Sequence, residues 1–162
     1  MDLKEYIRSI PDYPKKGILF RDITTLIKNE KAFTNCIDQN VEKSKKFDFN
    51  KIAAVESRGF VFASAMSYIL KKPFILLRKK NKLPAETYSV DFELEYGTAT
   101  IEMHKDSINK DDSVIIIDDL IATGGTAEAA AKLVKISNGK VSGFIFVINL
   151  FDLGGCDGLI KK

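Results

Sequence analysis

The sequence predicts an α/β protein whose central sheet is mainly parallel and is flanked by helices. Short apolar runs alternate along the chain with longer segments of helical periodicity, which is typical of strand–helix–strand units. One run, Val114 to Ile117, consists of consecutive β-branched residues and predicts a strand buried on both faces, as in a parallel sheet. The 162 residues, 45% hydrophobic and 29% charged, fit one globular domain over 1–162.

The first half of the chain predicts two helices before the first buried strand. Residues 2–9 suggest a short amphipathic helix, which Pro11 and Pro14 would stop. Asn29 is a suitable cap for a helix over about 30–46, whose apolar residues recur at helical spacing. We then expect a strand at 52–55, a loop at 56–59, a helix at 60–70 and a strand at 73–77.

The second half begins with a polar stretch, residues 78–96, that contains Pro84 and shows no clear periodicity. It predicts a long loop, and long loops in compact chains are usually functional lids. Residues 98–103 alternate and predict a strand, with Glu102 on its solvent-facing side. After the strand at 114–117 we expect a helix from Gly125 closed by Gly139, and a last strand at 141–150.

A ligand site is indicated where the strand at 114–117 leads into the next helix. Asp118 and Asp119 follow the strand, and the turn Ala122–Thr126 would point its free N–H groups toward a phosphate. Carboxylates a few residues away can accept hydrogen bonds from hydroxyls or help to hold a hydrated Mg²⁺. The implied ligand is a phosphorylated sugar. The alternative is that the carboxylates only cap an ordinary tight turn at Gly124–Gly125.

A second anion site is indicated at the ends of the two preceding strands. Arg58 stands just before a predicted helix, which places a forked guanidinium beside a helix N-terminus. The neighbouring strand ends in a basic group, Arg78, Lys79, Lys80 and Lys82. Because the carboxyl ends of parallel strands meet at one edge of a sheet, the ligand would carry a diphosphate as well as a monophosphate.

Composition excludes several other classes of protein. The net charge of +3 is too small to indicate nucleic-acid binding, and no apolar run reaches membrane-spanning length. The two cysteines, Cys36 and Cys156, form no disulfide framework and fit a reducing compartment. The first residues lack the apolar core of a secretory signal. We therefore expect a cytoplasmic protein with no nucleic-acid or membrane partner.

The segment Asp118–Thr126 resembles the phosphoribosyl-diphosphate motif of the type I phosphoribosyltransferases. Other stretches resemble the adenine-specific branch of that family, in the family's order: residues 17–24, 56–60, 82–84, 94–97 and 149–155. The resemblance implies the type I phosphoribosyltransferase fold, with an N-terminal hood at 1–28, a flexible catalytic lid at 78–96 and a homodimer. Asn81 departs from the pattern, because many members have glycine there, and the family would add one more strand after Lys162.

The resemblance also implies a reaction, in which adenine and phosphoribosyl diphosphate give AMP and pyrophosphate with Mg²⁺. Its site residues would be Asp118 and Asp119 for the ribose hydroxyls, directly or through the shell of the metal; Ala122, Thr123, Gly124, Gly125 and Thr126 for the 5-phosphate; Arg58, Arg78, Lys79 and Lys82 for the diphosphate; and Leu19, Phe20 and Arg21 for adenine. Glu95 would transfer the purine proton, and Tyr96 would close with the lid.

Two alternatives stay open. The first is a phosphoribosyltransferase for hypoxanthine, guanine or xanthine, but such relatives often recognise the base with residues after the phosphate motif, and few remain here. The second is a non-catalytic sensor of phosphoribosyl diphosphate that regulates transcription. The segment before Ile52 holds no helix-turn-helix with a basic recognition helix, which favours an enzyme.

Overall fold

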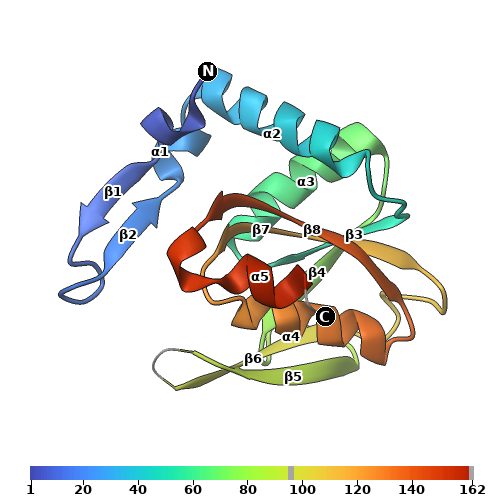
Figure 1. Cartoon of the computed structure of the whole chain (residues 1–162). Coiled ribbons are helices and arrows are strands. Elements are labelled where there is room, and N and C mark those ends of the chain that lie inside the picture. Colours follow the sequence, from blue (N-terminus) through green and yellow to red (C-terminus); the bar gives the residue numbers. More distant parts are fainter. Residues whose placement is uncertain (95–96, 161–162) are drawn as a thin grey trace. The chain divides into compact units, whose positions relative to one another are not determined.

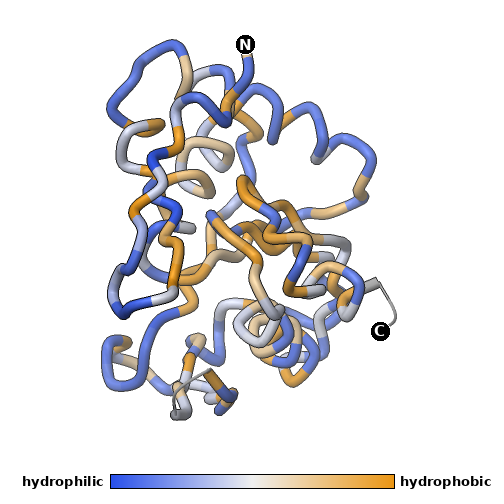
Figure 2. The backbone as a smooth tube through the Cα atoms, turned by 60° about the vertical axis from the view of Figure 1, so that its left-hand side comes forward, coloured by the Kyte–Doolittle hydropathy of each residue, from blue (hydrophilic) through white to orange (hydrophobic). Residues whose placement is uncertain are grey.

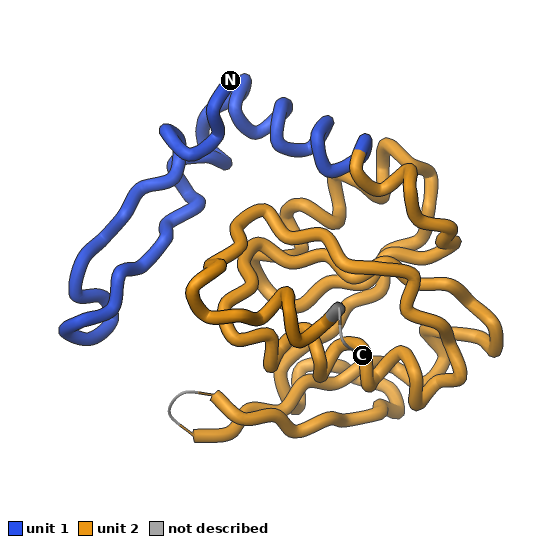
Figure 3. The backbone as a smooth tube through the Cα atoms, viewed as in Figure 1, with its two compact units in different colours: residues 1–42 blue, residues 43–162 orange. Residues whose placement is uncertain are grey.

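The computed structural model describes residues 1–94 and 97–160. The chain divides into two compact units, Met1–Glu42 and Lys43–Lys162 (Figure 3). The first unit contains η1 (Leu3–Tyr6), β1 (Arg8–Pro11), β2 (Leu19–Asp22), α1 (Thr24–Ile27) and most of α2 (Glu30–Ser44). Asn29 caps α2 as expected, because its side-chain oxygen accepts the N–H of Ala32 at 3.0 Å.

The helix predicted over residues 2–9 is wrong in its second half. Residues 3–6 form one 3₁₀ turn, and the chain then enters β1, which pairs antiparallel with β2. The pairing sets Arg8 opposite Asp22, whose carboxylate accepts hydrogen bonds from the Arg8 guanidinium and from the N–H of Thr24 at 2.9 Å. The Thr24 and Arg8 hydrogen bonds lower the pKa of Asp22 to about 2. Cross-strand pairing has therefore overridden the local helical pattern.

The second unit is built on a six-stranded sheet with the order β5-β6-β4-β3-β7-β8. The strands are β3 (Lys51–Val55), β4 (Phe74–Lys79), β5 (Thr87–Glu93), β6 (Thr98–His104), β7 (Ser113–Ile121) and β8 (Lys140–Asn149). Strands β4, β3, β7 and β8 run parallel, whereas β6 is antiparallel to both of its neighbours. The predicted fold class, α/β with a mainly parallel sheet flanked by helices, is confirmed.

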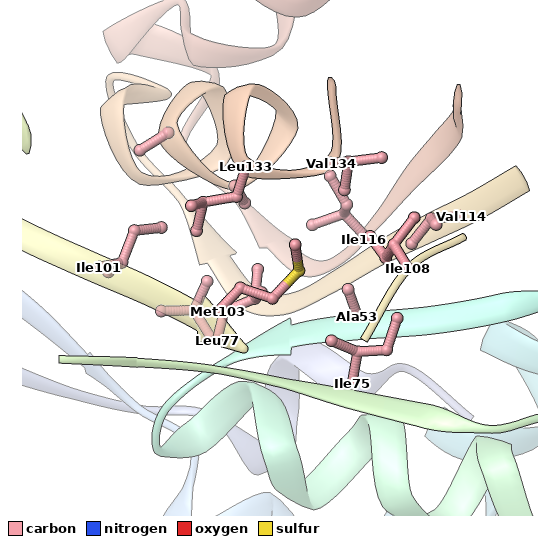
Figure 4. Packing of buried hydrophobic residues seen from close by; sticks show 13 residues of the cluster. Ala53, Ile75, Leu77, Ile101, Met103, Ile108, Val114, Ile116, Leu133 and Val134 are labelled. Carbon is pink, nitrogen blue, oxygen red and sulfur yellow. The ribbon is translucent and has the colours of Figure 1, made fainter. Parts of the chain in front are cut away.

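Helices cover both faces of this sheet. α3 (Arg58–Leu70) lies on one face and α4 (Gly125–Ile136) on the other (Figure 1). A buried cluster fills the space between α4 and the sheet, where Leu133 and Val134 of the helix meet Ile116, Leu77 and Met103 of the strands (Figure 4). The hydrophobic residues accordingly concentrate on the strands (Figure 2). After β8 come η2 (Phe151–Leu153) and α5 (Gly155–Ile160), which the sequence did not predict.

Three further expectations are corrected. Residues 78–96 are not one loop, because Thr87–Glu93 form β5, whose Tyr88, Val90 and Phe92 pack against the core cluster. Glu102 is only 6% exposed, because its carboxylate lies against the N–H of Asn81 and the hydroxyl of Ser89. The helix α4 is closed by Asn138, which has φ +63°, rather than by Gly139.

No helix of the described residues is long and apolar enough to cross a bilayer.

Candidate active site

The turn Ala122–Thr126, which we call the phosphate turn, connects a strand to a helix as its sequence predicts. β7 ends at Ile121, and α4 begins at Gly125 with Gly124 as its N-cap. Gly124 has φ +91°, a left-handed conformation that glycine adopts without strain. The free N–H groups of the first helical turn therefore face a small cavity of about 170 Å³, lined by the whole turn, Ala122, Thr123, Gly124, Gly125 and Thr126, together with Arg58, Asp118 and Asp119.

Gly155 packs against the backbone of this turn. Its N–H donates to the Ala122 carbonyl at 3.0 Å, so the start of α5 is hydrogen-bonded to the first residue of the turn. A Cβ at Gly155 would lie 2.4 Å from that carbonyl oxygen and 2.9 Å from the nitrogen of Gly124. Both contacts are with backbone atoms, so a larger side chain could not be accommodated without moving the turn.

The acidic pair lies beside the phosphate turn and next to Arg58. The two carboxylates belong to the last part of β7, which ends at Ile121, four residues beyond the predicted end of the strand at Ile117. Asp119 is 4% exposed, and its Oδ2 lies 2.7 Å from Nε of Arg58. Asp118 accepts the N–H of Asp119 at 2.9 Å.

The Arg58 guanidinium thus lies beside two carboxylates, Asp118 and Asp119, in the small cavity. Burial, followed by the negative charge of Asp119, raises the pKa of Asp118 to about 8. A ligand that brings hydroxyl donors or a cation to this pair would relieve the repulsion.

The N-terminus of α3 approaches β7 closely enough to set Arg58 over the pair. A Cβ at Gly59 would lie 2.9 Å from Oδ1 of Asp118 and 3.2 Å from the carbonyl oxygen of Ile117. Glycine at position 59 therefore permits the close contact that brings the guanidinium and the carboxylates together.

A larger cavity of about 770 Å³ shares Arg58, Asp118, Asp119 and Thr126 with the smaller one. Its other polar lining comes from three places: the loop after β3, the end of β4 with the turn that follows, and β6. The residues are Glu56 and Ser57; Lys79, Lys80 and Lys82; and Thr98 and Thr100. Cations predicted to hold a diphosphate therefore line the same space as the acidic pair.

Arg78, which was also predicted to bind the diphosphate, has a different set of contacts. Its Nη2 donates to Oε2 of Glu56 at 3.2 Å, and its Nη1 donates to the carbonyl of Lys82 at 3.2 Å. Glu56 also accepts the N–H of Lys79 at 2.6 Å. Burial of Glu56 acts to raise its pKa, but the Lys79 N–H and the Arg78 guanidinium together lower it from its usual value. We infer that Arg78 braces the turn that carries the lysines.

The hairpin of β5 and β6 forms the remaining wall. Phe92, Leu94 and Thr100 line the larger cavity, and a Cβ at Gly125 would lie 3.3 Å from the carbonyl oxygen of Glu93. The hairpin is therefore packed against the phosphate turn. Glu95 and Tyr96, the predicted proton-transfer and lid residues, lie outside the described residues, so their roles stay predictions.

The predicted adenine residues belong to the first unit. Leu19, Phe20 and Arg21 are consecutive on β2, where Phe20 is half-buried with its ring 5.1 Å from that of Tyr13. Arg21 Nη1 donates to the hydroxyl of Ser9 at 2.5 Å. Their role in binding a base also stays a prediction.

The sequence reasoning missed two residues near the site. Gly155 was part of a family-like stretch, and the glycine pair 154–155 was the one available signal. Glu102 had no signal at all, because alternation along β6 indicated an exposed side chain. The described residues contain no group of three or more His, Cys, Asp or Glu that could hold a metal ion by themselves.

Fold and site together define an α/β protein with a glycine-containing turn at a helix N-terminus, a lysine-rich turn after a neighbouring strand, and a pair of carboxylates that line both cavities. The phosphoribosyl transferase domain family matches residues 22–151. The adenine phosphoribosyltransferase of Pelagibacter ubique (strain HTCC1062) is 78% identical over 162 residues, which are 100% of this chain and 93% of that protein.

Solved structures of adenine phosphoribosyltransferases are also similar to this chain. The crystal structure of adenine phosphoribosyltransferase from Thermoanaerobacter pseudethanolicus has a TM-score of 0.95 at 47% identity, over 98% of this chain and 92% of that one. The Saccharomyces cerevisiae enzyme, crystallised with an imino-altritol bisphosphate and adenine, has a TM-score of 0.90 at 35% identity, over 96% and 91%. The chain therefore belongs to the phosphoribosyltransferase family and, within it, to the adenine phosphoribosyltransferases.

Proposed function

We propose that this chain transfers the 5-phosphoribosyl group of phosphoribosyl diphosphate to adenine, giving AMP and pyrophosphate in purine salvage. The observation that carries the proposal is that two cavities, one at the N-terminus of α4 and one lined by three lysines, meet at Arg58 and the acidic pair. A sugar with a phosphate at one end and a diphosphate at the other fits that arrangement. The relatives named adenine phosphoribosyltransferase supply the choice of base.

In this proposal the turn Ala122–Thr126 holds the 5-phosphate through its N–H groups, and Asp118 and Asp119 accept hydrogen bonds from the ribose hydroxyls. Holding the sugar at both ends places C1 in line for displacement. The bond from C1 to the diphosphate oxygen breaks as the bond from the purine nitrogen to C1 forms, and the ring carries positive charge in between. The nearby carboxylates stabilise that charge.

The leaving pyrophosphate takes the bonding electrons and gains negative charge. Arg58, Lys79 and Lys82 line the cavity where that charge would develop. The residues present also fit Mg²⁺, since two carboxylates face a single guanidinium and burial has raised the pKa of one of them. When bound through substrate oxygens and water, the ion would supply further neutralisation of the diphosphate.

The remaining roles are binding of the base and transfer of its proton. Adenine would stack on Phe20 and bond with the backbone of Leu19 and Arg21, and residues 1–28 would act as its hood. Residues 78–96 would act as the lid, with Glu95 taking the purine proton and Tyr96 closing beside it. Proton transfer of this kind typically contributes roughly 10²–10⁴-fold. Phe92 and Leu94, already in the cavity wall, would exclude water on closure.

A panel of bases tests the function. With Mg²⁺ and phosphoribosyl diphosphate present, we expect pyrophosphate release with adenine and little with hypoxanthine, guanine or xanthine. A chelator should remove the activity, and added Mg²⁺ should restore it. Release with another base but not adenine would contradict the substrate, and binding of phosphoribosyl diphosphate without turnover of any base would favour the sensor.

We also propose a homodimer that acts in the cytoplasm. Leu76 lies on β4, in the part of the strand that pairs with β3 but not with β6, and is 41% exposed on the face that Phe74 shares with Phe60 of α3. A second copy packed on this face would remove that side chain from water. Sedimentation velocity should show a dimer for the native chain and a monomer for Leu76→Glu with unchanged circular dichroism. A monomeric native chain would contradict the dimer. Cys36 and Cys156 are not joined in a disulfide, which fits the reducing conditions of the cytoplasm.

A further inference from the structure

Glu102 is a buried carboxylate that the proposed mechanism does not use. It lies on β6 between β4 and β5, paired in register with Arg78 on one side and with Ser89 on the other. Only 6% of the residue is exposed. A carboxylate in such a place is costly unless hydrogen-bond donors surround it, so its partners indicate why it is there.

Those partners belong to two elements of the site. Oε2 of Glu102 accepts the N–H of Asn81 at 3.1 Å, and Oε1 accepts the hydroxyl of Ser89 at 3.1 Å. Asn81 stands between Lys80 and Lys82 and has φ +65°. The carboxylate therefore holds the middle of the basic turn Lys79–Lys82 and joins it to β5.

Glu56 holds the same turn at its ends. It accepts the N–H of Lys79 at 2.6 Å, and through Arg78 it is linked to the carbonyl of Lys82. A turn with three lysine side chains gathered on a cavity needs such support, because like charges repel and a free loop loses entropy on binding an anion.

We propose that Glu102 is a positioning residue, which fixes the backbone of the turn Lys79–Lys82 so that its lysines meet the diphosphate. This inference rests on the proposed function, in which that turn binds the diphosphate. Glu102 touches no substrate in this scheme. Its bond to Ser89 also ties the turn to the hairpin whose residues Phe92 and Leu94 line the cavity.

Glu102→Gln is the main test, because it keeps the shape and removes the charge. A hydrogen bond to a charged group is stronger than one to a neutral group, so the variant should hold the turn less firmly. We expect roughly a tenfold rise in the KM for phosphoribosyl diphosphate and in the inhibition constant of pyrophosphate. The dissociation constant of ribose 5-phosphate and the KM for adenine should stay unchanged. Ser89→Ala, which removes one donor only, should shift the same constants in the same direction by a smaller factor.

The matched control is Asp111→Asn. Asp111 is an exposed carboxylate that lies 3.8 Å from Nζ of Lys140 and lines neither of the two cavities. We expect native constants from it. If Glu102→Gln and Ser89→Ala keep native pyrophosphate affinity, or if they weaken ribose 5-phosphate equally, Glu102 does not position the turn.

Lys82→Ala separates this inference from the function on which it rests. Weaker pyrophosphate binding by Lys82→Ala supports diphosphate binding at the turn, and native binding overturns it. Where Lys82→Ala weakens pyrophosphate binding, the double variant with Glu102→Gln should lose less than the product of the two single effects, because both act through one turn. Fully multiplicative losses would overturn the positioning role.

Discussion

Asp118→Asn is expected to lower kcat sharply while making the ligand-free protein more stable. In the folded chain, burial and the neighbouring charge of Asp119 raise the pKa of Asp118 to about 8, whereas an unfolded aspartate keeps its ordinary value of 3.8. Between those two pH values the folded chain holds a proton that the unfolded chain has released. Stability is therefore lost as pH rises through this window.

Asparagine cannot ionise, so the variant escapes this loss. Its melting temperature should match that of the native chain near pH 4 and exceed it by a growing margin up to about pH 8, by a few degrees. Its oxygen can still accept the N–H of Asp119 that Oδ1 accepts now at 2.9 Å. The gain illustrates the usual conflict between stability and a strained active site.

Activity should change in the opposite direction. Binding of the substrate and its cation favours the ionised form of Asp118, which the variant lacks. Loss of one electrostatic group that faces the developing positive charge of the ribose ring typically lowers kcat roughly 10²–10³-fold. Steady-state rates and calorimetry over pH 4–8 measure both effects. Asp111→Asn, which alters an exposed carboxylate, is the control and should change neither. Native activity in Asp118→Asn would remove the residue from the mechanism.

Gly155→Ala should impair binding of the 5-phosphate although Gly155 need not touch it. The added Cβ would lie 2.4 Å from the Ala122 carbonyl oxygen and 2.9 Å from the Gly124 nitrogen, so the phosphate turn must shift. A displacement near 1 Å at a binding group costs about 10²-fold in kcat/KM. Most of that loss should fall on the KM for phosphoribosyl diphosphate and on the affinity for ribose 5-phosphate.

Gly158→Ala is the matched control in the same helix. A Cβ there would meet only Oε1 of Glu128, at 3.8 Å, which is an ordinary contact. Alanine also favours a helix over glycine, so this variant should keep native kinetics. Gly155→Ala with a native KM for phosphoribosyl diphosphate would show that the contact behind the turn is dispensable. Pyrophosphate inhibition should be unchanged in both variants, which distinguishes a local shift from general unfolding.

Elements whose signals lie within a short stretch of sequence were predicted correctly. The cap at Asn29, the strand at 52–55 and the helix from Gly125 all follow from local patterns and all occur. The two strands that the sequence did not predict, β1 and β5, were missed for one reason. β1 and β5 are held by partners across a hairpin, and a segment whose partner is distant or unrecognised gives a weak periodicity.

By itself the sequence determined the fold class, the phosphate turn and the presence of two carboxylates and a basic group, because each of these lies within one short segment. Only the tertiary structure decided how the groups meet. Arg58 reaches Asp119, Gly155 supports Ala122, and Glu102 holds Asn81. These contacts join residues far apart in the chain, and they depend on strand register and close backbone approach, which no local spacing of residue types encodes.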